Sequence, residues 1–258
     1  MSDAYGFLLF LYRKVSFGVF LLLDLYFLLT LTISIMSSFY EKLMDLTLFK
    51  GAATDMIHAF AEKTPLSFYK VAPGDIIAAT DDLCSSLRCL VSGRVEVEHP
   101  LFDGNLSLFE TLGPGVVIGL KHLYGLDTHF CCNYRAVDTC GIMEFDKANF
   151  IQLIQNNNLI LVNYLNYLSL YAQKPISILR DADPRSSSLF LPTLLKGLTC
   201  RNAENITLVS HKMPIVLFLE KIFNITEVAL EKMIERGAVS LKSDYRLVVN
   251  DIDVLYYF

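Results

Sequence analysis

Seven short apolar segments, separated by turn-forming residues, occupy the chain from residue 66 to residue 145. The turns include Pro73-Gly74-Asp75 and Gly113-Pro114-Gly115, where proline fixes φ and glycine adopts positive φ. In segment 95–98 valine alternates with glutamate, so Val95 and Val97 share one face. This pattern predicts an antiparallel β-roll of the barrel or jelly-roll type. The predicted strands are 66–71, 76–79, 88–92, 95–98, 106–112, 134–137 and 141–145.

A long helix is predicted after the roll, over residues 150–170, with a break at residues 156–158. Pro175 is expected to end or kink it. Apolar residues at near-heptad spacing predict a dimer seam, and a second face is expected to pack on the roll. The seam residues are Leu161, Leu165, Leu168 and Ala172; the candidates for the second face are Val162 and Tyr164; and Asn163 and Asn166 are candidates for setting the register.

The last third of the chain reads as three helices and a hairpin. Residues 181–188 are polar and are expected to link two domains. Asn224 is predicted to cap the third helix, with Glu227 at its third position, and Gly237 is predicted to end it. The predicted helices are 189–198, 213–223 and 225–236, and the predicted hairpin strands are 238–241 and 245–249 around a turn at 242–244.

Residues 1–35 carry most of the chain's excess hydrophobicity. Segment 15–35 is long enough to cross a bilayer and follows Arg13 and Lys14, as the positive-inside rule requires. Asp24 opposes insertion, because a carboxylate at mid-membrane costs about 2.5–3.5 kcal/mol. Three interpretations remain open: translation that starts at Met36, with no extension in the protein; a membrane anchor; or a buried helix.

The histidines and cysteines show no catalytic pattern, which argues against an enzyme. His99, His122 and His129 lie near predicted turns and form no H-x-H pair, and we find no nucleophile–base set. The six cysteines show no CxxC spacing, which is typical of reduced thiols in a cytoplasmic protein. A redox role for Cys131 and Cys132 is the alternative, although in a strand their side chains would point to opposite faces. We therefore predict no catalytic residues, no metal site and no cofactor.

The order of motifs resembles the Crp/Fnr family of bacterial transcription regulators. The segments VAPGDII, LRCLVSGRVEVE, LFETLGPGVVIG and YRAVDTCGIMEFDKANFIQLIQNN resemble its cyclic-nucleotide-binding domain, over about residues 39–174. The C-terminal layout resembles the winged helix-turn-helix of the same family. The resemblance implies an α+β protein: a cyclic-nucleotide-binding-like antiparallel β-roll (36–145), a dimerisation helix region (146–180) and a winged helix-turn-helix domain (181–258), after the hydrophobic extension 1–35.

The family's phosphate-binding segment, a short helix, corresponds to residues 117–124. Its ribose-binding Glu falls on Leu120, and its phosphate-binding Arg-Ser pair falls on Phe130-Cys131. Leucine cannot accept a hydroxyl hydrogen bond and phenylalanine cannot neutralise a phosphate, so we expect neither cyclic AMP nor cyclic GMP to bind. A more apolar small effector and a collapsed, empty pocket remain as alternatives. The expected pocket residues are Gly119, Leu120, Lys121, His122, Phe130, Cys131 and Arg135.

DNA binding is the function that the resemblance implies for the C-terminal segment. Residues 181–258 carry nine Lys/Arg and ten Asp/Glu, a net charge of −1, and the whole chain carries −5, so only a local patch can attract DNA. The candidate DNA-binding residues are Lys212, Asn224, Thr226, Glu227, Val228, Glu231, Lys232, Lys242 and Arg246.

The sequence thus predicts a cytoplasmic, homodimeric DNA-binding regulator whose sensor domain has lost its cyclic-nucleotide determinants. The alternative is a protein-interaction or structural module on the same scaffold that does not bind DNA. A link to the inner membrane through residues 15–35 is expected only if the extension is translated.

Overall fold

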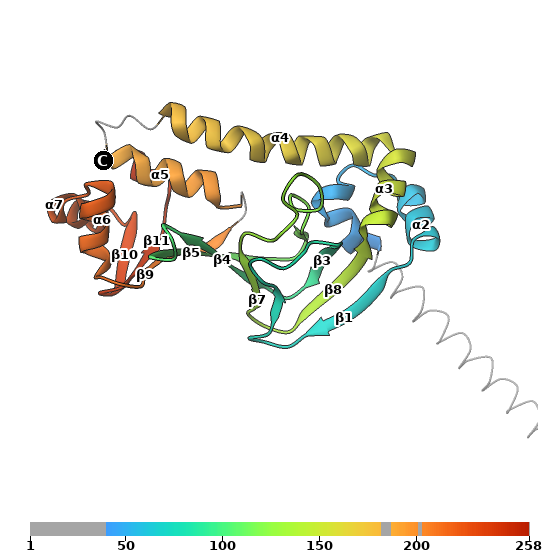
Figure 1. Cartoon of the computed structure of the whole chain (residues 1–258), viewed down its shortest axis with the longest axis horizontal. Helices are drawn as coiled ribbons and strands as arrows, with labels where there is room; N and C mark the ends of the chain where they lie inside the picture. Colours follow the sequence, from blue (N-terminus) through green and yellow to red (C-terminus); the bar gives the residue numbers. More distant parts are fainter. Residues whose placement is uncertain (1–39, 182–186, 201–202, 258) are drawn as a thin grey trace, which may run out of the picture. The chain divides into compact units, whose positions relative to one another are not determined.

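The computed structural model describes the backbone of residues 40–181, 187–200 and 203–257 (Figure 1). Within it, Met44–Phe258 form one compact unit. The predictions for residues 1–35, including the membrane anchor, lie outside the described residues. None of the described helices is both long and apolar enough to cross a bilayer. The first elements are η1 (Thr47–Phe49), α2 (Thr54–Lys63), β1 (Ser67–Val71), β2 (Ile76–Ala78), β3 (Ser86–Ser92), β4 (Val95–Leu101), β5 (Leu106–Leu112), β6 (Val117–Ile118), β7 (Asn133–Ala136) and β8 (Cys140–Asp146).

Two antiparallel sheets form the roll, which confirms the predicted antiparallel β-roll. One has the order β1-β8-β3-β6, and the other contains β5-β4-β7-β2 at one end. Val95 and Val97 are both buried, as the alternation in β4 predicts. The turn between β3 and β4 requires Gly93, since a Cβ atom there would lie 2.6 Å from the carbonyl oxygen of Thr139.

Aromatic side chains fill the roll beneath the helices. Phe145 on β8 contacts the rings of Phe60 and Phe150, at centroid distances of 5.5 and 6.4 Å. Phe150 in turn meets Tyr164 edge-on at 5.0 Å. Because Phe150 and Tyr164 belong to consecutive helices, this cluster fixes both helices on the roll.

The long helical region is divided where the sequence predicts a break. α3 (Lys147–Asn156) is followed by α4 (Asn158–Asp181), and the side chain of Asn157 between them accepts hydrogen bonds from the backbone of Leu159 and Ile160. Of the two outcomes expected at Pro175, an end of the helix is wrong, because α4 continues to Asp181, and a kink stays a prediction. Loss of one backbone N–H at proline is tolerated within a helix of 24 residues.

The C-terminal elements follow α4 in the order helix, strand, two helices and hairpin. They are α5 (Ser187–Leu198), β9 (Glu204–Ser210), α6 (Ile215–Phe223), α7 (Glu227–Glu235), β10 (Val239–Ser243), β11 (Arg246–Val249) and η2 (Val254–Tyr257). Strand β9 was missed by the sequence analysis.

The predicted N-cap of the third helix is wrong by two residues. Asn224 ends α6 in the left-handed conformation, with φ 51°, and Thr226 caps α7 by accepting a hydrogen bond from the backbone of Ala229. Glu227 is consequently the first residue of α7 and forms no capping box. The predicted C-terminal end is confirmed: Gly237 has φ 73° and donates its N–H to Ile234.

Strand β9 joins the C-terminal hairpin to the roll. The second sheet has the full order β10-β11-β9-β5-β4-β7-β2, so hydrogen bonds run without interruption from the hairpin into the roll. In the ladder between β5 and β9, Leu106 is opposite Ser210 and Leu108 is opposite Leu208. Leu106 and Leu108 also belong to the apolar core that α5, α6 and α7 cover. A boundary between separate domains at residue 181 stays a prediction.

Candidate functional site

A small cavity lies between the roll and helix α4, and Lys121 is the one expected pocket residue that lines it. It has room for about one water molecule. A cyclic nucleotide is many times larger. Its lining comes from β4, β5, β6, β7, α4, α5 and the segments after β5, β6 and α5: Val97, His99, Glu110, Leu112, Val116, Val117, Lys121, Tyr134, Tyr167, Tyr171, Leu198 and Cys200.

Two tyrosines of α4 fill much of the space. The rings of Tyr167 and Tyr171 contact each other at a tilt of 48°, with centroids 4.7 Å apart, and the Tyr171 hydroxyl lies 3.4 Å from the Cys200 sulfur. Burial raises the pKa of both hydroxyls above the ordinary range. The ammonium of Lys121 lies 5.2 Å from the centre of the Tyr171 ring. On this side the cavity is therefore bounded by two neutral aromatic groups and one cation.

A buried carboxylate forms the opposite wall. Glu110 on β5 is 1% exposed, and one of its oxygens lies 2.9 Å from Nε2 of His99 on β4. The other oxygen accepts a hydrogen bond from the backbone N–H of Cys200, at 2.7 Å. Glu110 thus ties the roll to the segment that leads into β9, and each carboxylate oxygen has a partner.

The segment after β6 differs from the short helix that the resemblance implies. Residues 119–126 form turns and bends. Gly119 and Gly125 have φ of +93° and +119°, which lie outside the helical region. Only five residues separate these two glycines, which is little room for a helix between them. A Cβ atom at Gly119 would lie 2.8 Å from the Cys84 sulfur, so the position is too crowded for a side chain.

The seven expected pocket residues do not form one site. Lys121 alone among them lines the cavity. Leu120 and Phe130, which the resemblance aligns with the ribose- and phosphate-binding residues, are buried, with 1% and 2% exposure. The guanidinium of Arg135 donates to the carbonyl of Gly74, on the face of β7 opposite to Tyr134. Arg135 therefore has a structural role in the roll.

His122 and Cys131 approach each other instead, outside the cavity. The Cys131 sulfur lies 3.7 Å from His122 Nε2, and Cys132 follows it in a bend that precedes β7. Residues 131 and 132 form no strand, so the strand geometry that would separate the two sulfurs does not apply. Hydrogen bonds from Cys132 and His122 lower the pKa of the Cys131 thiol well below its usual range. Sequence reasoning placed His122 and Cys131 in the effector pocket and weighed Cys131 and Cys132 as a redox pair, but it did not combine the three residues into one cluster.

We expect calorimetric titration of the full chain with cyclic AMP or cyclic GMP to show no binding at millimolar nucleotide. The cavity is too small, and Leu120 and Phe130 provide no polar partner for ribose or phosphate. Heat of binding with a dissociation constant in the micromolar range would show that the cavity opens for a nucleotide and would contradict this expectation.

The nine candidate DNA-binding residues are all exposed. Thr226, Glu227, Val228, Glu231 and Lys232 lie at the start of α7 or on it, while Lys242 and Arg246 belong to the β10–β11 hairpin. Lys212 lies before α6, and Asn224 lies between α6 and α7. The apolar core residues of α7, Leu230 and Met233, are buried on its other face.

Helix α4 presents an apolar stripe to solvent. Leu165 is 51% exposed, Ala172 is exposed, and Leu161 and Leu168 are half-buried. An adjacent face, about 90° away around the helix, packs on the roll through Ile160 and Tyr164, which are buried. Val162 was a candidate for that packing face and is 50% exposed, so this assignment is wrong. Asn163 donates to the carbonyls of Leu48 and Lys50 within the chain, so it does not set a dimer register.

Comparison with known proteins supports part of this picture. Residues 69–157 match the family described as "Cyclic nucleotide-binding domain". This match covers β1 to α3 and confirms the resemblance for that segment. A search of curated proteins found no match.

Several solved structures are similar to this chain in fold. The catabolite activator protein of Thermus thermophilus is 19% identical, with 81% of this chain and 96% of that chain covered, at a TM-score of 0.45. The sensor domain of the transcriptional regulator DNR from Pseudomonas aeruginosa is 13% identical, with 50% of this chain and 90% of that chain covered, at a TM-score of 0.42. The CO-dependent transcription factor CooA from Carboxydothermus hydrogenoformans is 17% identical, with 80% of this chain and 92% of that chain covered, at a TM-score of 0.36.

Proposed function

We propose that the chain is a homodimeric DNA-binding transcription regulator whose sensor domain does not bind cyclic nucleotides. The observation that carries the proposal is the C-terminal arrangement. Helix α7 follows α6 after a three-residue turn and has an exposed polar face, and the hairpin β10–β11 follows directly. Elements α5, β9, α6, α7, β10 and β11 follow one another in the order of a winged helix-turn-helix, with β11 paired between β9 and β10.

Charge distribution assigns different roles to helix and hairpin. Glu227, Glu231 and Glu235 lie on α7, where their carboxylates repel phosphates but can accept hydrogen bonds from the N4 group of cytosine. Lys242 and Arg246 are exposed on the hairpin and carry the positive charge that phosphates require. In this proposal α7 reads base edges and the hairpin holds the backbone.

The apolar stripe of α4 supplies the proposed dimer contact. The stripe on α4 is partly exposed to water in a single chain, and it would be buried if it packed against the same stripe of a second copy. It consists of Leu161, Leu165, Leu168 and Ala172. Two α7 helices related by this contact would read two half-sites about 34–36 Å apart along DNA. The state of the roll would then act on operator affinity through the relative orientation of the two copies.

Substituting Lys242 and Arg246 together with alanine tests the role of the hairpin. We expect weaker binding to every DNA sequence, and a slope of log affinity against log salt that is smaller by about 2 because two phosphate contacts are lost. The measurement is fluorescence anisotropy with the full chain at several salt concentrations. The matched control replaces Lys63 and Lys70, which are exposed on α2 and β1 and change the net charge equally. An unchanged slope in the Lys242/Arg246 variant would remove the hairpin from the interface.

The acidic character of α7 favours a second candidate, a protein-interaction module that does not bind DNA. Three glutamates on a helix of nine residues give poor non-specific affinity for a phosphate backbone. This alternative predicts that anisotropy stays flat for DNA at low salt, in the native chain and in both charge variants.

A further inference from the structure

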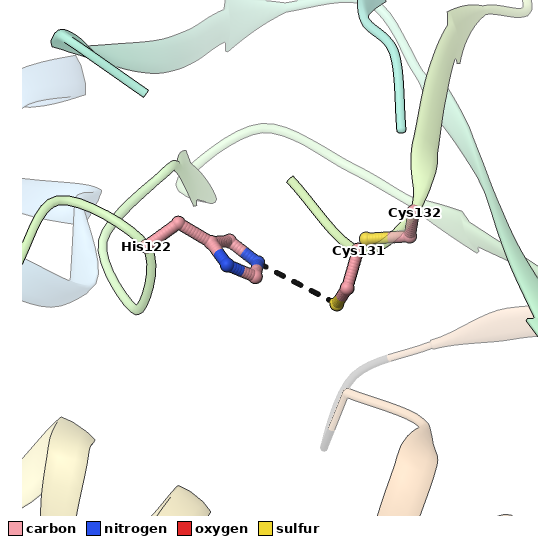
Figure 2. Close-up of side chains that lie close together, drawn as sticks. All are labelled: His122, Cys131 and Cys132. Atoms are coloured by element: carbon pink, nitrogen blue, oxygen red, sulfur yellow. Dashed lines mark hydrogen bonds between the residues drawn. The ribbon is translucent and has the colours of Figure 1, made fainter. Parts of the chain in front are cut away.

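Three side chains with soft metal-binding atoms meet beside the roll, at a place that the proposed function does not use. His122 lies on the turn after β6, and Cys131 and Cys132 lie on the segment that enters β7 (Figure 2). One ligand atom from each residue lies within 4.8 Å of the other two, and the Cys131 sulfur is 3.7 Å from His122 Nε2. Among the described residues, no other group of three or more His, Cys, Asp or Glu side chains brings its ligand atoms within this distance.

The spacing agrees with a tetrahedral metal centre. Zn–N bonds of about 2.05 Å and Zn–S bonds of about 2.3 Å at tetrahedral angles place nitrogen and sulfur ligands about 3.6 Å apart, and two sulfur ligands about 3.8 Å apart. The observed 3.7 Å between Cys131 and His122 already has this value. In the other two pairs the ligand atoms are less than 4.8 Å apart. Movements of about 1 Å or less would bring these atoms to the tetrahedral spacing.

We propose that His122, Cys131 and Cys132 bind a zinc ion, with the fourth coordination position open to solvent. The donor set of two thiolates and one imidazole suits Zn²⁺, which prefers sulfur and nitrogen ligands in tetrahedral geometry. Cys131 is exposed, so an ion can enter from solvent, while Cys132 and His122 are buried and hold the inner side of the site.

Charge balance supports zinc at this position. Two thiolates side by side repel each other, whereas two thiolates, a neutral imidazole and one Zn²⁺ carry no net charge. Lys121, next to His122 in sequence, would oppose a centre with excess positive charge, and a neutral centre avoids this cost. Binding would release the thiol protons, since only the thiolate coordinates.

Zinc would join two segments that border the cavity. Lys121 precedes His122 and lines the cavity, and so does Tyr134, two residues after Cys132. The metal would therefore link the turn after β6 to the start of β7. This inference does not depend on DNA binding, because its readouts are metal affinity and absorption.

The test is a competition titration of the reduced full chain with Zn²⁺ against a chromophoric chelator, without oxygen. We expect one zinc ion per chain. Cys131→Ser, Cys132→Ser and His122→Gln should each weaken the affinity by at least about 100-fold, because each removes one of three protein ligands. Cys200→Ser and His129→Gln are matched controls that remove a thiol and an imidazole outside the cluster, and they should bind as the native chain does.

A second readout separates coordination from folding defects. Co²⁺ added to the native chain should give a near-ultraviolet absorption band from sulfur-to-cobalt charge transfer, and this band should weaken when either Cys131 or Cys132 is replaced. Without metal, the far-ultraviolet circular dichroism spectra of the variants should match that of the native chain. Two results would overturn the proposal. One is absence of zinc binding by the reduced chain. The other is binding that persists in all three ligand variants but is lost in a control. If the chain as purified contains a Cys131–Cys132 disulfide and the reduced chain binds no zinc, the pair has a redox role instead.

Discussion

Replacement of Glu110 by alanine is expected to lower the free energy of unfolding by about 3 kcal/mol. The carboxylate is 1% exposed and bonds to the imidazole of His99 and to the backbone N–H of Cys200. Each partner would lose a hydrogen bond inside the protein, at about 1–3 kcal/mol apiece, and a cavity would open between them. Equilibrium urea denaturation, followed by circular dichroism, measures the change.

Two further variants make this measurement specific. Glu204→Ala removes an exposed carboxylate from β9 and should change stability by no more than about 0.5 kcal/mol. Glu110→Gln keeps an oxygen for the Cys200 N–H and an amide for His99, and should recover about half of the loss. A native midpoint for Glu110→Ala would show that the carboxylate does not tie the roll to the segment before β9.

Replacement of Leu165 by lysine is expected to dissociate the proposed dimer. In a symmetric seam two ammonium groups would face each other where two leucine side chains packed, so both charges would lose water without gaining a partner. We expect the dimer dissociation constant to rise by at least about 100-fold, which corresponds to about 2.7 kcal/mol. Sedimentation equilibrium of the full chain measures it.

Helix α4 provides a matched control for this substitution. Leu170 is 48% exposed, close to the 51% of Leu165, and lies five residues further along the helix. Five residues correspond to a rotation of about 140° around the helix, so Leu170 lies away from the stripe. Leu170→Lys should leave the dimer intact. Equal dissociation by both variants would mean that the stripe has no special role, and a monomeric native chain would exclude the dimer altogether.

The roll could be predicted because its determinants are local. Turn residues such as Gly74 and Gly113 mark the ends of strands, and alternation in β4 identifies the buried face. The break between α3 and α4 was also predictable, since Asn157 caps the second helix with its own side chain. In each case the residues that decide the structure are within a few positions of the element that they define.

The pairing of β9 with β5 could not be predicted in the same way. Ile206, Leu208 and Ser210 alternate on the buried face of β9, but their partners on β5 are about a hundred residues earlier in the chain. Local propensity does not specify a partner at that separation. The N-cap error has a similar cause: Asn224 is suited both to an N-cap and to the left-handed end of a helix, and the tertiary position of α6 decides between them.

The structure does not bring the seven predicted pocket residues together in one cavity. Leu120 and Phe130 are both buried, and the loss of cyclic-nucleotide binding that they led us to expect stays a prediction. The cluster of His122 with Cys131 and Cys132 depends on a bend at residues 131–132. The adjacent cysteines were the available signal, and a non-extended backbone there would have placed both sulfurs on one side.

Selection of DNA from a random-sequence pool by the full chain, at about 50 mM and about 150 mM salt, tests the proposed regulator most directly. The account predicts enrichment of a palindrome whose half-sites are centred about 10–10.5 base pairs apart or a multiple of that distance. It also predicts that Lys242→Ala/Arg246→Ala weakens this enrichment. A folded chain that retains no sequence at either salt concentration would contradict DNA binding and leave the protein-interaction module as the function of this scaffold.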